Sequence, residues 1–232
     1  QAEGTSDTQA VKEKQKETSD PLSANMKLLN QWGEQAETVQ SLYKAAFKVL
    51  ALKSNATFAD VAGAPEIRRL CAEKGIVHLG GPLLGTVTSD GARVWLRTVR
   101  PAKVEVRVSF DGVEKSYGPV ESTLETDLTA IVPVTGLKPG TLNTYRVLVD
   151  GKPIAIPEDA SIVTPPDDTK PAKVRIAFGT CYHKWGLGNQ KQAELIRSRK
   201  PAALLLYGDI AVQDRNNNVG LHRADYLLRD SF

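Results

Sequence analysis

The fold of the second half of this chain is decided by two runs, VRIAFGTCYH at residues 174–183 and AALLLYGD at residues 202–209. Each run begins with a short apolar strand pattern and ends in side chains of the types that bind metals. A segment with helical character, from about Asn189 to Ser198, separates them. The order strand, helix, strand predicts a βαβ unit with two parallel strands.

Three side chains at the ends of these strands are candidate metal ligands: Cys181, His183 and Asp209. Neighbouring parallel strands end at one edge of a sheet, where open α/β sheets place their ligands. Thiolate, imidazole and carboxylate are the side chains that bind transition metals, so we expect a hydrolase-like metal site. Two alternatives stay open: Cys181 and His183 as a nucleophile and base for acyl transfer, and Asp209 as an ordinary turn residue after Gly208.

The segment PPDDTKP at residues 165–171 has the composition of a linker. Before it, apolar and polar residues alternate with period two between turn signals such as Asp90-Gly91 and Asp150-Gly151, which predicts an antiparallel sandwich. The expected strands are 85–88, 92–99, 103–109, 126–134, 144–149 and 160–164. The corner at residues 136–141 resembles that of fibronectin type III-like domains, with Asn143 in place of the usual corner tyrosine.

The amino-terminal part is expected to be a tail followed by helices. Residues 1–20 are polar and predict a disordered tail. Apolar residues then recur at steps of three and four, which predicts one helix over about 23–52. Asp60 is expected to cap a second short helix, and Pro65 to begin a third that ends before Gly75. Cys71 is expected to be buried on the face of that third helix.

Composition excludes several classes of protein. The formal net charge of +3 is spread along the sequence without a basic stripe, so no nucleic-acid specificity is expected. No apolar run is long enough to span a membrane. The chain begins at Gln1 with a polar tract, which favours an exported periplasmic or extracellular protein over a cloned fragment. Cys71 and Cys181 are its two cysteines, and a disulfide between them would compete with metal binding by Cys181.

The motifs Phe178-Gly179-Thr180-Cys181 and Tyr207-Gly208-Asp209, preceded by a sandwich, resemble those of PhoD-like alkaline phosphatases and phosphodiesterases of the calcineurin-like metallophosphoesterase superfamily. The resemblance covers residues 80–232. It implies metal-dependent hydrolysis of a phosphoester substrate at a multi-metal centre of iron with calcium. It also implies that Cys181 binds iron and that Asp209 bridges metals.

The sequence departs from the family at two points. Val212 stands where the family has a tyrosine that binds iron. Cys181-Tyr182-His183 has the spacing of the Asp-x-His motif of the wider superfamily, so His183 becomes a ligand that the PhoD-like pattern does not supply. Zinc is therefore possible beside iron. Asp214, Arg215 and His222 are interpreted as turn, loop or helix residues, in preference to phosphate contacts.

The family's later metal-binding motifs would lie beyond Phe232, so we expect the chain to be the amino-terminal part of a larger protein. Its partner would be the carboxy-terminal remainder of that protein, as a second chain or a missing part, and activity would require it. The alternatives are a non-catalytic binding or structural module built on the sandwich, and a hydrolase of another ester on the same scaffold.

The expected organisation has five parts. They are a disordered tail (1–20), a helical segment (21–78), a fibronectin III-like β-sandwich (79–165), a linker (166–172) and the incomplete amino-terminal part of a metallophosphoesterase domain (173–232).

Overall fold

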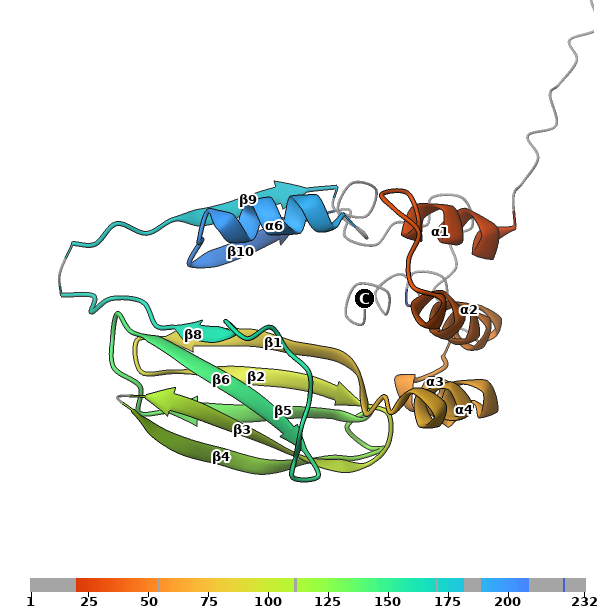
Figure 1. Cartoon of the computed structure of the whole chain (residues 1–232), viewed down its shortest axis with the longest axis horizontal. Coiled ribbons are helices and arrows are strands. Elements are labelled where there is room, and N and C mark those ends of the chain that lie inside the picture. Colours follow the sequence, from red (N-terminus) through yellow and green to blue (C-terminus); the bar gives the residue numbers. More distant parts are fainter. Residues whose placement is uncertain are drawn as a thin grey trace, which may run out of the picture.

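The structure is a computed structural model that describes residues 20–53, 55–110, 112–169, 171–181, 189–208 and 223. Helices from the amino-terminal part lie at one end of a pair of antiparallel sheets, and a strand–helix–strand unit lies along one side of these sheets (Figure 1). The predicted disordered tail over residues 1–20 lies, apart from Asp20, outside the described residues.

Two helices occupy the region where one long helix was predicted. They are α1 (Pro21–Leu29) and α2 (Glu37–Leu52), so the prediction of a continuous helix over 23–52 is wrong. Asn30 ends α1 through its side chain. The side-chain N–H group donates to the Met26 carbonyl at 3.0 Å, and the side-chain oxygen accepts the Gln35 N–H at 2.8 Å. The apolar period continues across the break because both helices bury their apolar faces in the same core.

Two shorter helices follow, α3 (Phe58–Gly63) and α4 (Pro65–Lys74). Thr57 caps α3, accepting the Asp60 N–H, while the Asp60 carboxylate accepts the Thr57 N–H at 2.7 Å. Asp60 was expected to be the N-cap of this helix, but the N-cap is Thr57. Asp60 lies three residues later and completes a capping box. The predicted bounds of α4 are confirmed, since Gly75 follows it in a left-handed conformation.

Two antiparallel sheets pack face to face over residues 78–163, which confirms the predicted antiparallel sheets (Figure 1). The first sheet has the order β1 (His78–Thr88), β2 (Gly91–Thr98), β5 (Thr129–Thr135). The second has the order β4 (Val113–Ser122), β3 (Ala102–Phe110), β6 (Leu142–Val149), β7 (Lys152–Pro153), and β8 (Ser161–Val163) also pairs with β6. Alternate residues of the central strands, such as Val104, Val106 and Val108, are fully buried between the sheets.

Strand β4 was not predicted from the sequence. Most of its residues are exposed, and it lies at the edge of its sheet, paired with β3. Gly118 and Pro119 interrupt the alternation in its middle, where the pairing register with β3 also shifts. An edge strand needs neither a continuous apolar face nor every backbone donor, so its sequence carries a weak strand pattern.

The helices share one apolar cluster with the edge of the sandwich. Leu79 of β1 and Leu128, which precedes β5, belong to this cluster and not to the core between the sheets. Leu128 is only 1% exposed. Beside it, the Asp127 carboxylate accepts the Ala59 N–H of α3 at 2.8 Å and pairs with Arg97 at 3.4 Å. Apolar packing and a hydrogen bond therefore hold the helices against the sandwich.

The third part of the fold consists of β9 (Ile176–Thr180), α6 (Gln190–Ser198) and β10 (Ala203–Tyr207). Strands β9 and β10 are parallel neighbours. An ion pair of 2.7 Å between Arg197 of α6 and Asp159, which precedes β8, links this part to the sandwich.

Asn143, near the start of β6, makes a buried hydrogen bond that links β6 to β8. It is 1% exposed, and its amide donates to the Ile162 carbonyl at 3.2 Å and the Thr141 hydroxyl at 3.0 Å. We expect Asn143→Ala to lower the free energy of unfolding by about 1–3 kcal/mol, because buried acceptors lose their donor. Thr144→Ala, at the exposed neighbouring position, should change it by less than about 0.5 kcal/mol in the same urea titration. Equal stability of the two variants would contradict this role.

His78, at the start of β1, has a buried Nδ1 without a hydrogen-bond partner in the described part of the chain. Burial lowers the pKa of His78 below its ordinary value of 6.5. The unfolded chain therefore takes up this proton at higher pH than the folded chain. The stability that comes from keeping His78 neutral is therefore complete above pH 6.5, and it is lost as the pH falls toward the folded-state pKa.

We expect His78→Gln to flatten the fall in the free energy of unfolding between pH 7 and pH 5. The change in slope cannot exceed about 1.4 kcal/mol per pH unit, the value for one proton. Urea titrations at a series of pH values measure it, and the other two histidines are common to both proteins. An unchanged slope in the variant would show that His78 does not titrate differently on folding.

Candidate metal centre

Strands β9 and β10 end together at one edge of their sheet. Their pairing is in register from Ile176 opposite Ala203 to Thr180 opposite Tyr207. Parallel pairing brings both carboxyl ends to the same side, which is where ligands bind in open α/β sheets. The residues that follow Thr180 and Tyr207 therefore leave the sheet side by side.

Local interactions around α6 set this register. The Asn189 side chain caps the helix by accepting the Gln192 N–H at 3.1 Å. After the helix, Lys200 adopts a left-handed conformation with φ +49°, which turns the chain toward the second strand. The Ala202 N–H then donates to the Arg175 carbonyl at 2.8 Å, which aligns the two strands before their regular pairing begins.

Both strands end in a residue of left-handed conformation. Cys181 has φ +57° and Gly208 has φ +46°. They directly follow Thr180 and Tyr207, the last residues that the register pairs. Glycine adopts this conformation readily, but it is uncommon for cysteine. Left-handed residues other than glycine concentrate at binding and catalytic sites, where surrounding structure holds them in place.

The Cys181 thiol lies at the rim of this edge and is partly exposed. The Thr180 hydroxyl is 3.7 Å from its sulfur. The same hydroxyl lies 3.7 Å from the position that a Cβ on Gly208 would occupy, so Thr180 is close to both strand ends. The sequence motif contained Thr180, but nothing in it indicated this position.

The two cysteines have different environments, and they form no disulfide with each other. Cys71 is buried in α4, on the same face as Ile67, as predicted. Burial raises the pKa of the Cys71 thiol to about 11, which keeps it protonated and unsuited to metal binding at neutral pH. Cys181 is thus the cysteine whose position suits a ligand.

Of the three predicted ligands, the structure places Cys181. His183 and Asp209 lie outside the described residues, as do Val212, Asp214, Arg215 and His222. Within the described ranges no group of three or more His, Cys, Asp or Glu side chains gathers in one place. The donor that is placed, a partly exposed thiol at a strand end, fits iron or zinc better than calcium.

We expect one fast-reacting thiol in the native chain. At pH 7.5 a pKa of about 11 leaves roughly one Cys71 thiolate per 3000 thiols. Titration with a disulfide reagent should give one thiol in the folded protein and two after unfolding. Cys181→Ser should abolish the fast reaction and Cys71→Ser should preserve it. Fast labelling of Cys71 in the folded chain would contradict the assignment.

Comparison with known proteins gives a match for the sandwich. The sequence model of a domain of unknown function, DUF7800, matches residues 77–168, the part that contains β1 to β8. No curated protein matches the chain. A solved structure described as "Structure of PhoD" is similar at 15% sequence identity and a TM-score of 0.43. The similarity covers 64% of this chain and 35% of that one, so this chain spans about a third of that structure.

Proposed function

We propose that this chain is the amino-terminal part of a metal-dependent phosphoester hydrolase of the PhoD-like type. The observation that carries the proposal is the shared edge at which β9 and β10 end. There Cys181 and Gly208 directly follow the last paired residues of the two strands, and both have left-handed conformations. In the sequence, Asp209 directly follows Gly208, so a thiolate and a carboxylate belong to the two strand ends.

The sandwich supports the expected order of parts. Its sheet orders, β1-β2-β5 and β4-β3-β6, are compatible with a fibronectin III-like domain over residues 79–165. In the proposed organisation this domain follows a helical segment (21–78). It is joined by a linker (166–172) to the first βαβ unit of a metallophosphoesterase domain (173–232).

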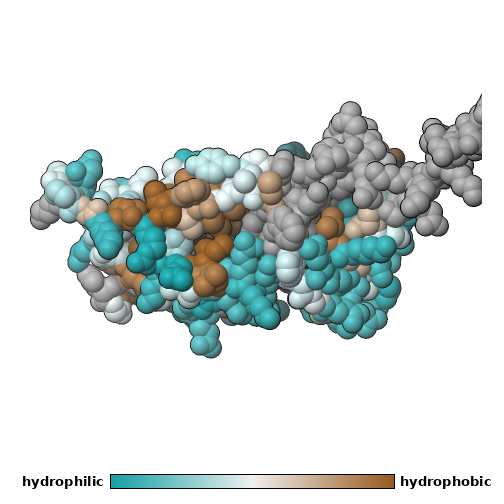
Figure 2. Space-filling view, turned by 90° about the horizontal axis from the view of Figure 1, so that it is seen from above, coloured by the Kyte–Doolittle hydropathy of each residue, from teal (hydrophilic) through white to brown (hydrophobic). Residues whose placement is uncertain are grey.

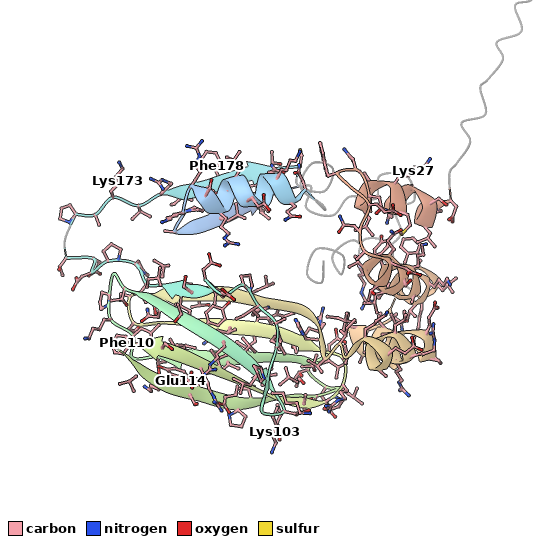
Figure 3. The ribbon with its side chains drawn as sticks, in the orientation of Figure 1. Lys27, Lys103, Phe110, Glu114, Lys173 and Phe178 are labelled. Carbon is pink, nitrogen blue, oxygen red and sulfur yellow. The ribbon has the colours of Figure 1, made fainter. Side chains whose placement is uncertain are left out.

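Exposed apolar side chains support the view that this unit is incomplete. Phe178 of β9, labelled in Figure 3, is 77% exposed. Tyr207 of β10 is 57% exposed, and Leu195 of α6 is also exposed. Brown patches interrupt the polar surface on the side of the molecule that carries the unit (Figure 2). Two parallel strands cannot cover their own faces. We propose that the carboxy-terminal remainder of the same protein covers them and completes the metal site.

The residues of this chain would hold and orient the metals. Cys181 would bind as a thiolate, His183 through its imidazole, and Asp209 as a bridging carboxylate. Bound metal ions supply Lewis acidity toward a phosphoryl group. The Thr180 hydroxyl, 3.7 Å from the Cys181 sulfur, would help to fix the position of that ligand. The resemblance implies iron with calcium, and zinc also suits these donors. Val212 occupies the position of the tyrosine that binds iron in the family.

The location remains a prediction from the sequence. We propose that the protein is exported, to the periplasm or outside the cell. No helix of the described residues is long and apolar enough to cross a membrane.

Metal analysis of this chain together with the remainder of its domain tests the proposal. We expect stoichiometric iron, zinc or calcium and hydrolysis of a phosphoester. Cys181→Ala and Asp209→Ala should lose the metal and lower kcat/KM by more than about a hundredfold, since residues that only support a ligand already account for about 10–100-fold. Cys71→Ala is the matched control and should keep its metal. A fully folded, metal-free protein would overturn the proposal.

A binding role for the sandwich is the second candidate, and one surface feature favours it. Leu83, Trp95 and Ile131 are cross-strand neighbours on β1, β2 and β5, and all three are at least partly exposed. Arg93 and Arg97 lie on either side of Trp95 on the same face of β2, and the Arg97 guanidinium is 5.3 Å from the Trp95 ring. A metal-free protein that keeps binding a partner through this face would support this role.

A further inference from the structure

A cavity of about 530 Å³ opens where the helices meet the sandwich, and it is unrelated to the strand ends described above. Its walls come from α3, α4 and two loops, one around Val99–Pro101 and one over residues 124–128. Helices α3 and α4 lie beside the ends of the sandwich strands (Figure 1). Small-molecule sites are typically concave, largely apolar and about 300–1,000 Å³ in volume.

The cavity exists because small residues occupy the helix faces that line it. Ala59, Ala62 and Gly63 contribute from α3, and Ala72 contributes from α4. Larger apolar side chains, including Ile76, Leu124 and Leu128, form the opposite walls. Backbone hydrogen bonds hold these walls in place, since the Val99 N–H donates to the Val77 carbonyl at 3.1 Å and the Thr98 N–H to the Leu128 carbonyl at 2.9 Å. The cavity is thus preformed.

The charged side chains that line the cavity are both cationic. They are Arg68 of α4 and Arg100, and no Asp or Glu is among the described residues of the lining. The Arg68 guanidinium reaches to 3.7 Å from the position of a Cβ on Gly63. It forms no hydrogen bond or ion pair within the part of the chain that the structure describes. Arg100 pairs with Asp150 at 2.7 Å but keeps a largely exposed side chain.

Other polar groups of the lining are already hydrogen-bonded or neutral, so they add no charge to the cavity. The N–H groups of Gly75 and Ile76 donate to the Ala72 and Cys71 carbonyls, so the carboxyl end of α4 is capped. Burial raises the pKa of the Cys71 thiol to about 11, which makes it a neutral, weakly polar wall. The electrostatic character of the cavity therefore comes mainly from the Arg68 guanidinium, with Arg100 already shared with Asp150.

We propose that this cavity binds a small anionic amphiphile, a carboxylate carried on an apolar chain. The apolar walls would cover the chain, and Arg68 with Arg100 would receive the carboxylate at the mouth, where guanidinium groups match its geometry. The site is separate from the proposed metal centre, so its test does not depend on phosphoester hydrolysis.

Decanoate, below its micellar concentration, is the probe, titrated into the 232-residue chain by calorimetry. We expect saturable binding of one molecule per chain, with amide shifts in NMR spectra at Ile76, Val99 and Leu124. Decanol and decyltrimethylammonium, which have the same chain but a neutral or cationic head, should bind at least about tenfold more weakly. That factor corresponds to the loss of one charge-assisted hydrogen bond.

Variants on the surface of α4 provide the matched controls. Arg68→Glu should weaken decanoate binding at least about tenfold. Arg69→Glu, the same change at the next position, should not, because Arg69 pairs with Glu73 and does not line the cavity. Ala72→Phe, at an exposed helix position, should fill the mouth and abolish binding. Binding that does not saturate, equal binding of the cationic amphiphile, or an Ala72→Phe variant that binds normally would overturn the proposal.

Discussion

The arrangement of the molecule depends on Leu128, which directly precedes β5 of the sandwich but is buried in the apolar cluster of the helices. Asp127 and Leu128 both have positive φ, 51° and 60°, and this turn directs the leucine into the helical cluster. The carboxylate next to it accepts an N–H of α3. Without this contact the four amino-terminal helices would lack one wall of their core. The same loop, through Leu124 and Leu128, lines the cavity together with α3 and α4.

Elements with local signals were predictable from the sequence, and elements defined by distant partners were not. Helix α4 carries Pro65 at its start and Gly75 after its end, and both act within one turn of the helix. The break at Asn30 was missed because apolar spacing reports which face is buried and not whether the backbone is continuous. Strand β4 was missed because, at an edge, its stability comes from hydrogen bonds to β3 and not from its own apolar face.

For the candidate metal centre, the sequence predicted that the two strands end at one shared edge. Apolar runs that end in Cys181 and in Gly208-Asp209 imply one shared edge, and the parallel register of β9 and β10 brings the ends together. The left-handed backbone of Cys181 has no signal in the sequence, since cysteine does not favour it. The cavity was beyond prediction for a different reason: four separate segments line it, and each alone reads as an ordinary helix face or loop.

The conformation of Cys181 also determines which ligands this backbone could accept in other sequences. Aspartate and asparagine adopt left-handed conformations several times more readily than other residues with a Cβ, whereas β-branched residues are strongly disfavoured. An exchange of the thiol for a carboxylate would therefore relax the backbone at the strand end. In the proposed metal centre, the same exchange would replace a soft donor with a hard one, which suits calcium, magnesium or manganese better than a thiolate does. Under that proposal, a single substitution at this strand end would change the metal preference and leave the sheet as it is.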